Sequence, residues 1–383
     1  MESPERTRSG PADPGAMSPA DRPPLAPTGA AGPLDPTGRE VTGPVDQPAD
    51  PAGPSTTDLI GQPADPVQSH WRGRFRALGT EVALDLTAPD AAGLARRCQA
   101  LVEELENRLS GFRPDSDVSR LNRDPGHWLT VAESTDTVLR AALAGFWATD
   151  GAFAVARPQP LATGHSGPTG PPGVDGGSSP ADWAGRPGTP AGPGLSDGGD
   201  RRWRLELGHR LDLGGIAKGH IADQVLARCL RAGASHLLID LGSSSLALWG
   251  GRPAGGPWRV ALRNPGGSRD QALGLLEVES GAVSTSGLDE RGQHLIDPAS
   301  GRPARSGAEQ VTVLAADGLT AEIWSTALMV AGPDGLLRHY RPGAGFEAVV
   351  MTAQSILASP GLSGLRLTGR DGRDLTAPDS VRA

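Results

Sequence analysis

The most regular hydrophobic pattern in the chain lies between residues 204 and 242. Apolar and polar residues alternate over residues 204–213, which predicts a strand, and the pair Gly214 and Gly215 then allows a tight turn. From about Ile216 the apolar positions recur every three or four residues, so a helix should follow and should end near Gly233. The apolar run after that glycine predicts a buried strand. We expect this strand, turn, helix and strand to organise the rest of the chain.

The same patterns predict further strands and helices on both sides of this unit. Helices are expected over residues 90–109, 133–149 and 319–332, with a short helical turn after the loop that begins at residue 110. Strands are expected on both sides of the turn at residues 78–80 and over residues 258–265, 273–280, 281–287, 311–316 and 346–353. Gly332 and Pro333 should end the last helix. Three tryptophans are expected in the core: Trp147, Trp249 and Trp324.

Glycine and proline divide the chain into ordered and unstructured parts. They make up 54 and 36 of the 383 residues, which is too many for one fold throughout. Residues 1–69 lack apolar periodicity and are predicted to be disordered. Residues 157–200 have a similar composition and are predicted to form a flexible insertion inside a single globular domain of residues 70–370. The tail, residues 371–383, should fray.

Charge and cysteine usage exclude several classes of protein. The formal net charge is −8 and no long basic run is present, so we expect no nucleic-acid partner. Cys98 and Cys229 each fall on an apolar helical stripe, which predicts two reduced core thiols rather than a disulfide or a zinc site. No segment reaches the ~20 apolar residues of a spanning helix, and no apolar signal segment is seen. These features predict a cytoplasmic protein without a direct membrane span.

The central glycine turn is the first candidate for chemistry. A helix that starts behind two glycines presents free N–H groups and a partial positive charge, which favour a phosphate. Lys218 in the first turn adds a full charge, and Asp212 before the turn can bind a hydroxyl, a ring N–H or a cation. The pattern is neither a Walker motif nor a dinucleotide fingerprint. A helix that merely starts after a glycine turn explains these glycines equally well.

Four blocks in sequence order resemble the ApbE family of FAD:protein FMN transferases. They are LGT with LSGFRPDS, DLGGIAKGHIAD, STSGLDERGQHLIDPASGRP and AEIWSTALMVAG. The resemblance runs over roughly residues 75–367, and the third block is the most specific. It implies an α/β fold of the α+β kind, in which helices pack on an antiparallel-rich sheet in an ApbE/T-fold-like arrangement. It also implies that Mg²⁺-bound FAD gives its FMN half to a Ser or Thr hydroxyl of an acceptor flavoprotein and releases AMP.

The resemblance also implies roles for individual residues. His294 would be the general base, and Lys218 would act beside it on the phosphates. Mg²⁺ would be held by the carbonyl oxygen of Gly215 and by the side chains of Glu322 and Thr326. The positions that contact FAD would be Leu78, Phe112, Phe153, Ala154, Asp212, Lys218, His294 and Ile296.

Physical chemistry is consistent with these roles. Cleavage of a pyrophosphate needs its charge neutralised, which Mg²⁺ and a lysine can do. A histidine, with a reference pKa near ~6.5, suits a base at neutral pH. Glu322 and Thr326 are four residues apart and so share one helical face, and Mg²⁺ accepts such sparse oxygen ligation. Taken without the resemblance, His294 reads as a loop histidine and Glu322 as a solvated helix residue.

Two other functions stay open. Glu322 stands where the family usually has aspartate, and Ala154 stands where it usually has an acidic residue. One alternative is a protein that binds FAD without transferring it. The other is hydrolysis of FAD to FMN and AMP, in which water takes the place of the acceptor hydroxyl.

Overall fold

The computed structural model of the chain describes residues 67–159, 192–265, 267, 271–288 and 295–367. The predicted disordered segment lies outside these residues up to position 66, and so does the predicted tail. Most of the predicted insertion, residues 160–191, and the predicted base His294 also lie outside them. Among the helices that are described, none is long and apolar enough to cross a bilayer.

An antiparallel sheet runs through the centre of the described part of the chain, where eight strands pair in the order β1-β2-β8-β9-β12-β15-β16-β17. Each neighbouring pair in this order is antiparallel. The strands are β1 (Ser69–Ala77), β2 (Thr80–Ala88), β8 (His236–Leu241), β9 (Ser245–Trp249), β12 (Gly281–Gly287), β15 (Ala308–Ala315), β16 (Phe346–Thr352) and β17 (Ile356–Ala358). The sheet confirms the predicted α/β fold with antiparallel-rich strands.

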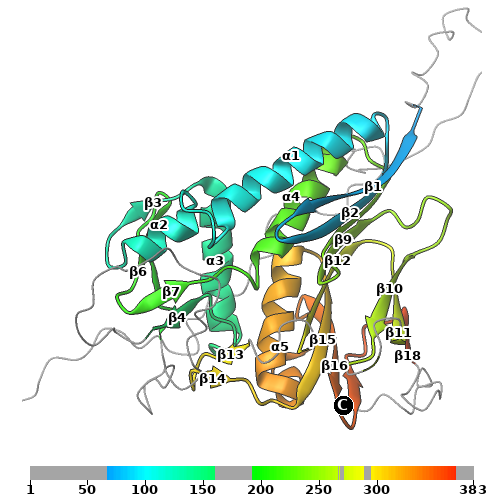
Figure 1. The fold of residues 1–383 in the computed structure, drawn as a ribbon. Helices are drawn as coiled ribbons and strands as arrows, with labels where there is room; N and C mark the ends of the chain where they lie inside the picture. The colour runs from blue at the N-terminus through cyan, green and yellow to red at the C-terminus, as the bar shows by residue number, and fades with distance from the viewer. Residues whose placement is uncertain (1–66, 160–191, 266, 268–270, 289–294, 368–383) are drawn as a thin grey trace, which may run out of the picture.

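Three long helices lie on one face of this sheet (Figure 1). They are α1 (Ala91–Leu109), α4 (Ala217–Arg231) and α5 (Gly318–His339). Alternate residues of a strand point to the same face, and Val82, Leu84 and Leu86 of β2 are at most 1 % exposed. They belong to the same apolar core as Val102 of α1 and Val225 of α4. The main core therefore lies between the sheet and these helices.

Smaller elements lie to the left of α5 and of the start of α4 in Figure 1, whereas the main sheet lies on the other side of α5. The helices and short strands on this side are α2 (Asp117–Arg123), α3 (Glu133–Ala148), β3 (Leu129–Thr130), β4 (Ala156–Pro158), β5 (Leu195–Asp197), β6 (Arg202–Leu205), β7 (His209–Leu211), β13 (Ile296–Asp297) and β14 (Arg302–Pro303). β3 and β5 flank β6, β4 pairs with β7, and β13 pairs with β14. Of these elements, α3 packs against α5, and β4 and β13 line a small cavity together with Thr326 of α5.

A second small sheet covers part of the opposite face of the main sheet. Its strands are β10 (Trp258–Arg263), β11 (Ala272–Val278) and β18 (Leu365–Leu367). A separate apolar cluster joins it to Leu248 of β9, Val283 of β12 and Met351 of β16. Among the described residues, none of β1 or β2 belongs to this cluster. The outer face of β1 and β2 is therefore left without an apolar cover from this sheet.

Two glycines bring α4 and α5 into direct contact. A Cβ atom on Gly219 would collide with the carbonyl oxygen of Gly318, and a Cβ on Gly318 would collide with that of Gly219. One turn further along α4, Asp223 accepts hydrogen bonds from the backbone N–H groups of Gly318 (2.6 Å) and Leu319 (3.2 Å). Asp223 of α4 thus caps α5, and this contact fixes the first turn of α5 against α4.

Most predicted elements are confirmed, and their ends follow local rules. Asp90 caps α1 by accepting from the N–H of Gly93 at 2.9 Å. Gly233 has a φ of 76° just beyond α4, as expected of a residue that ends a helix. Cys98 and Cys229 are both buried, as their positions on apolar helical stripes predict, and their Sγ atoms lie 3.5 Å apart.

Some predicted boundaries are wrong. The single strand expected over residues 204–213 is two strands, because the chain turns at Gly208 with a φ of 76°. The ends of the predicted insertion are also not structureless, since β4 overlaps its first two residues and β5 lies inside it. Gly332 does leave the helical conformation (φ 67°, ψ −159°), but a helical segment resumes at Pro333. Proline suits the first turn of a new helix, so the pair marks a kink rather than an end.

Two of the three tryptophans are not core residues. Trp324 is 5 % exposed, whereas Trp147 and Trp249 are each 39 % exposed. Neighbouring helix residues point about 100° apart, and in α3 it is Phe146 that faces inward, at 8 % exposure. Trp147 packs edge-on against Phe146 from the outside.

Candidate active site

The glycine turn before α4 is held by the side chain of Asp212. Its Oδ1 accepts from the N–H of Gly214 at 2.9 Å, and Nη2 of Arg157 lies 3.6 Å from its Oδ2. Ile216, which precedes the first turn of α4, offers no side-chain cap. The N-terminus of α4 therefore presents its partial positive charge without a neutralising cap, as the sequence pattern predicts.

Lys218 lies in the first turn of α4 and is half-buried. Its Nζ donates a hydrogen bond to Oγ of Ser244 in the turn between β8 and β9. That turn is tight, since Gly242 and Ser243 both have positive φ values of 78° and 63°. Lys218 is also the only lysine among the 36 lysines and arginines of the chain. A sequence that uses arginine everywhere else thus keeps an ammonium group at this position.

Glu322 of α5 is buried between the helix and the sheet. Its carboxylate oxygens accept from Oγ of Ser245 in β9 and from Oγ of Ser284 in β12, the latter at 3.0 Å. Ser284 in turn shares a hydrogen bond of 2.9 Å with Ser325. Burial raises the pKa of the Glu322 carboxyl, while the charge of Lys218 and the two serine hydroxyls oppose that change. The carboxylate therefore sits among hydroxyl groups with one cation nearby.

Two other buried titratable groups lie on α4. Burial raises the pKa of the Asp223 carboxyl to about 7, although the N–H groups of Gly318 and Leu319 act against it. Burial also lowers the pKa of His220 to about 4, and Nε2 of this ring has no hydrogen-bond partner among the described residues. His220 is therefore a neutral imidazole at neutral pH.

The predicted metal ligands lie along one side of the α4–α5 contact. A Cβ atom built on Gly215 would lie 3.4 Å from Oγ1 of Thr326, so the glycine turn rests directly against α5. Glu322 is one helical turn before Thr326 on the same face. The described residues contain no group of three or more His, Cys, Asp or Glu side chains that could hold a metal. A cation here would therefore depend on a carboxylate, a hydroxyl and a carbonyl, which is a donor set that Mg²⁺ accepts.

A small cavity of about 30 Å³ opens beside these groups, between β4, the β13–β14 pair and α5. Three of the predicted site residues line it: Ala154, Ile296 and Thr326. Leu295 lines it as well, directly after the predicted base His294. The cavity thus brings together residues from two of the four sequence blocks, the third and the fourth, with Ala154 from outside the blocks. The space is that of about one water molecule, well below the ~300 Å³ of typical ligand pockets.

Three predicted flavin contacts lie elsewhere in the described chain. Phe112 is 99 % exposed in the loop before α2, while Phe153 is 1 % exposed in the main core. Leu78 occupies the β1–β2 turn with a φ of 57° and is half-buried against the core. None of the three lines the small cavity. Their predicted contacts with FAD stay predictions.

Sequence reasoning missed the hydroxyl groups that surround the two charged site residues. They are Ser244, which binds Lys218, and Ser245 and Ser284, which bind Glu322. One signal was available for Ser284, because a run of small hydroxyl residues inside a predicted core strand must find buried partners. The serines after β8 had no such signal, since their partners are distant in sequence.

Known proteins resemble this chain over most of its ordered length. The model of the ApbE family matches residues 78–350. A FAD:protein FMN transferase from Klebsiella pneumoniae (strain 342) is 30 % identical over 321 residues, which cover 74 % of this chain and 90 % of that protein. The flavin transferase ApbE from Vibrio cholerae has a solved structure that matches with a TM-score of 0.63 at 25 % identity, covering 77 % of this chain and 98 % of that one. The crystal structure of the ApbE protein from Thermotoga maritima matches with a TM-score of 0.61 at 25 % identity, covering 76 % and 97 %.

Proposed function

The chain belongs to the ApbE family, and on this premise we propose that it is a FAD:protein FMN transferase that uses Mg²⁺ and modifies a Ser or Thr hydroxyl. In this reaction the acceptor oxygen forms a bond to the phosphorus of the FMN phosphate. The bond from that phosphorus to the AMP oxygen breaks, and AMP leaves. The names of the relatives support FAD and an acceptor protein as substrates. The hydroxyl class, the metal and the release of AMP are part of the proposal.

The observation that carries the proposal is the convergence of charge at the α4–α5 contact. Lys218 and the uncapped N-terminus of α4 are positive, and the buried carboxylate of Glu322 lies within the electrostatic reach of Lys218. A pyrophosphate beside Lys218 would gain a charge-assisted hydrogen bond in addition to the helix terminus. Such an arrangement suits the cleavage of a bond between two phosphates, which depends mainly on positioning and charge neutralisation.

The residues of this site fit a magnesium ion. Gly215 would supply its carbonyl oxygen, Glu322 its carboxylate and Thr326 its hydroxyl. When bound, Mg²⁺ supplies charge neutralisation for the phosphates during transfer. The hydroxyls of Ser245 and Ser284 hold the Glu322 carboxylate, so this longer side chain keeps a defined position despite its extra methylene group. Mg²⁺ commonly retains several waters, and one of these can bridge the ion and the Glu322 carboxylate where the two do not touch directly.

The remaining roles belong to residues inside and outside the small cavity, of which Ala154 and Ile296 line it. We propose that His294 takes the proton of the acceptor hydroxyl and that Ile296 and Ala154 line the flavin nucleotide beside it. Asp212, fixed by Gly214 and Arg157, presents its carboxylate at the mouth of the glycine turn. Leu78, Phe112 and Phe153 are proposed to approach FAD from the outer loops and from the core.

A transfer assay tests the proposal. The full chain is incubated with FAD, MgCl₂ and a panel of synthetic peptides that carry Ser or Thr, and products are identified by mass spectrometry. We expect a peptide with one FMN adduct and an equal amount of AMP. FMN and AMP without an adduct would instead show hydrolysis of FAD, and intact FAD with measurable binding would show a protein that only binds it. Activity that persists in excess EDTA would contradict the magnesium requirement.

A further inference from the structure

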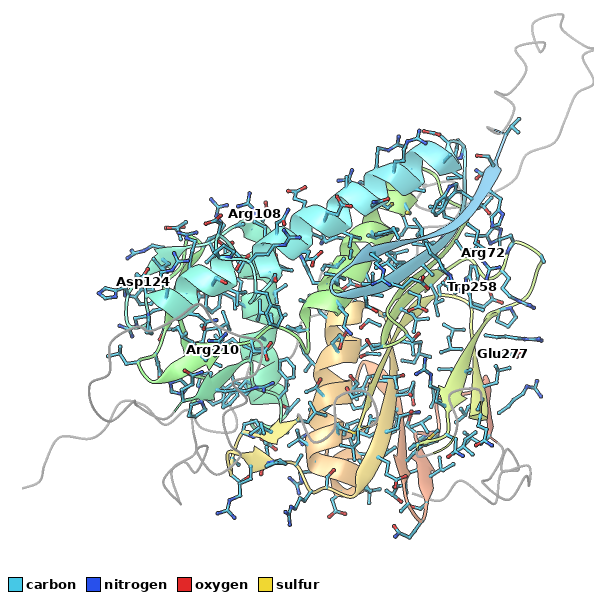
Figure 2. All side chains as sticks on the ribbon, in the orientation of Figure 1. Arg72, Arg108, Asp124, Arg210, Trp258 and Glu277 are labelled. Atoms are coloured by element: carbon cyan, nitrogen blue, oxygen red, sulfur yellow. The ribbon has the colours of Figure 1, made fainter. Side chains whose placement is uncertain are left out.

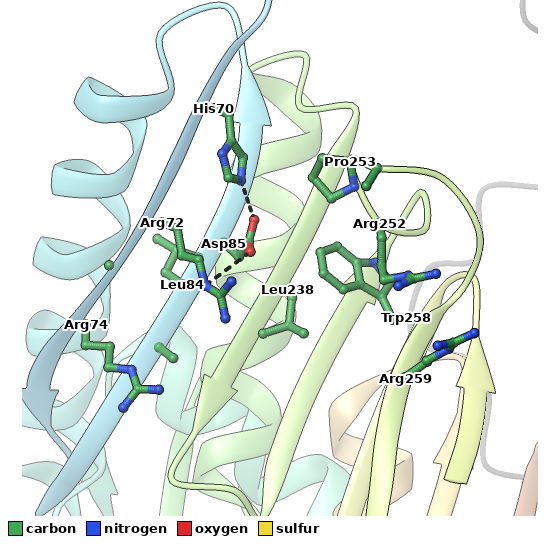
Figure 3. A pocket seen from close by; sticks show the side chains of 13 residues that line it. His70, Arg72, Arg74, Leu84, Asp85, Leu238, Arg252, Pro253, Trp258 and Arg259 are labelled. Carbon is green, nitrogen blue, oxygen red and sulfur yellow. Dashed lines mark hydrogen bonds and ion pairs between the residues drawn. The ribbon is translucent and has the colours of Figure 1, made fainter.

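A trough lies on the open face of the main sheet, away from α1, α4 and α5, where Arg72 and Trp258 are labelled in Figure 2. Its volume is about 760 Å³, and it runs between β1, β2 and β8 on one side and the start of β10 on the other (Figure 3). Six of its lining residues carry ionisable side chains: His70, Arg72, Arg74, Asp85, Arg252 and Arg259. This volume is within the range of about 300–1,000 Å³ that ligand-binding clefts occupy.

Strand register determines which charges line the trough. Arg72 of β1 lies opposite Asp85 of β2, and Asp85 lies opposite Leu238 of β8. Two residues closer to the β8–β9 turn, Arg74 lies opposite Ala83, and Ala83 lies opposite Asp240 of β8. Because alternate residues of a strand face the same side, the arginines of β1 form one continuous wall. Figure 3 shows Arg252 and Arg259 on the facing wall.

Positive groups outnumber negative groups along this surface. Among the described lining residues Asp85 is the only acid, and it is already shared by Nε2 of His70 at 2.7 Å and Nε of Arg72 at 3.6 Å. Nε of Arg252 is buried without a hydrogen-bond partner among the described residues. The chain as a whole carries a formal charge of −8. The net charge along the trough is therefore positive, although the net charge of the whole chain is negative, and this favours an anionic partner.

Arg74 and Arg259 each form one exposed ion pair. Nη1 of Arg74 lies 2.7 Å from Glu81, and Nε of Arg259 lies 3.2 Å from Glu277, both from outside the trough. The side chains of Arg74 and Arg259 are 67 % and 54 % exposed. Exposed pairs of this kind contribute little free energy, so their guanidinium groups can take a second carboxylate.

The shape of the trough suits an extended polypeptide. Leu238 lies between the two arginine walls, and the ring of Trp258 lies beside Arg252 on the facing wall, so the trough also has apolar partners to offer (Figure 3). From His70 to Arg74 the wall is roughly 13 Å long at ~3.3 Å per residue, which is room for about four extended residues. Guanidinium groups bind carboxylates through two parallel hydrogen bonds. A short acidic segment would therefore find both charge and apolar partners here.

Beyond Arg74, the strands that line the trough lead to the turn between β8 and β9, which carries a hydrogen-bond partner of Lys218. Asp240, in the same row as Arg74, accepts from the N–H of Ser243 at 2.5 Å in the turn between β8 and β9. The charges of both Arg74 and Lys218 act on the Asp240 carboxyl, lowering a pKa that burial raises. The next residue of this turn, Ser244, is the one that binds Lys218. A segment lying in the trough would thus lead towards the turn that positions Lys218.

We propose that this trough is the docking surface for the acceptor protein and that it binds an acidic segment next to the hydroxyl to be modified. The proposal rests on the proposed function, since it assigns the trough to the substrate of that reaction. It predicts that acidic residues near a Ser or Thr make a polypeptide a better acceptor, independently of FAD binding.

Binding is measured first, with a fluorescein-labelled peptide of Asp, Glu, Gly and Ser residues as the probe. A matched peptide replaces Asp and Glu by Asn and Gln. We expect the full chain to bind the acidic peptide at low salt, and we expect the triple variant Arg72→Gln, Arg74→Gln, Arg252→Gln to bind it at least about tenfold more weakly. The control variant changes three exposed arginines of α1 in the same way: Arg96→Gln, Arg97→Gln and Arg108→Gln.

Equal loss of binding in both triple variants would overturn the proposal, because it would show attraction by general surface charge. Failure of the full chain to bind the acidic peptide would overturn it too. Tighter binding to phosphatidylglycerol vesicles than to the peptide, lost in the trough variant, would assign the surface to a membrane and also overturn it.

Transfer is measured second, with the same two peptides each carrying one Thr and with FAD and MgCl₂ present. We expect the acidic peptide to acquire FMN about tenfold faster than its neutral match in the wild-type chain and in the α1 control. The trough variant should modify both peptides at one rate, with FAD affinity unchanged. If the wild-type chain modifies both equally, the docking inference is wrong although the transferase activity stands. If neither peptide nor any other acceptor is modified while the acidic peptide still binds the trough, it is the proposed function that fails.

Discussion

Two charged regions of this molecule differ in how far their ionisable side chains are buried and hydrogen-bonded. On the helix-covered face of the sheet, Glu322 is 5 % exposed and both of its carboxylate oxygens accept hydrogen bonds from serine hydroxyls. On the open face, Arg72 and Arg74 have side chains that are 77 % and 67 % exposed, in pairs that water can replace. A buried charge must be surrounded by partners to exist at all, whereas an exposed one is free to bind something else.

The buried region around Glu322 holds its groups in fixed positions, as a chemical step needs, whereas the exposed arginines can adapt to a partner. Free energy depends strongly on single groups where water is excluded, because each lost partner leaves a desolvated charge or hydroxyl behind. At the exposed surface the same change is compensated by solvent. Substitutions in the two regions should therefore differ in size, and the following tests are ordered from the largest expected effect to the smallest.

Glu322→Gln should have the largest effect. We expect transfer to fall on the order of 10³-fold, about 4 kcal/mol in activation free energy, because the amide cannot replace an anionic ligand of Mg²⁺. The fold should survive, since the amide oxygen still accepts from one of the serines and removal of a buried charge is favourable. Glu322→Asp should keep activity. Glu103→Gln, at an exposed position of α1, is the matched control. The rate of FMN transfer and the circular dichroism spectrum measure the two effects.

Asp223→Asn should change the pH dependence of stability. The pKa of this carboxyl is about 7 in the folded chain against a reference value of 3.8, so the folded state holds a proton that the unfolded state releases between these pH values. Its contribution to stability is therefore lost as the pH rises from about 4 to about 7. The free energy of unfolding of the Asn variant should rise relative to that of the wild type across this window, by on the order of 4 kcal/mol in total.

The measurement is urea unfolding at several pH values between 4 and 8. His220, whose folded pKa is about 4 against a reference of 6.5, gives the opposite slope, with stability rising between these values. That slope is present in both proteins and cancels in their difference. A difference that stays constant with pH would contradict the prediction.

Gly219→Ala tests the contact that fixes Lys218 relative to Glu322. The new Cβ would meet the backbone oxygen of Gly318 and lie 2.7 Å from Cγ of Glu322, and the backbone atom cannot move aside alone. We expect a loss of about 1–3 kcal/mol in the free energy of unfolding, as for overpacked cores. Gly111→Ala is the control, because its Cβ would meet only Val118 at 3.8 Å. If Gly219→Ala and the wild type unfold at the same urea concentration, α4 and α5 can move apart without a loss of folding free energy, and the prediction is wrong.

The triple variant Arg72→Gln, Arg74→Gln, Arg252→Gln should have the smallest effect on stability. Substitutions of the exposed Arg72 and Arg74 change the free energy of unfolding by about 0.5 kcal/mol or less each, because solvent replaces the lost ion pairs. Removal of the buried Nε of Arg252, which has no partner among the described residues, breaks no hydrogen bond of that nitrogen. Thermal unfolding of this variant beside the wild type checks the expectation. A loss above about 3 kcal/mol would mean that these arginines hold the sheet together, which would remove the contrast between the two faces.

Local patterns in the sequence predicted individual elements well. Helix α1, with its cap at Asp90 and its apolar stripe, depends on residues within a few turns of one another. The glycine turn before α4 and the stop at Gly233 are equally local. The site positions Gly215, Glu322 and Thr326 were predicted from the family resemblance and not from local patterns. Among these described residues, the structure brings Gly215 into contact with Thr326.

Long-range pairing could not be predicted. The trough exists because β1 and β2 join β8, more than 140 residues further along the chain, with Ala83 opposite Asp240. No periodicity within either segment encodes that partner or its register. Ser245 and Ser284 were missed for the same reason, since their acceptor Glu322 lies on α5. Trp147 was misplaced because an apolar residue next to an inward one is not itself inward.

The single lysine makes the active-site region selectively addressable by chemistry. Reagents that modify amines can react with Nζ of Lys218 and with the α-amino group at the start of the chain, while all other cationic side chains are guanidinium or imidazole groups. Reductive methylation with ¹³C-formaldehyde keeps the positive charge and would give one side-chain signal in an NMR spectrum. Because Nζ donates to Ser244 beside the β8–β9 turn, that signal would report directly on phosphate arriving at α4.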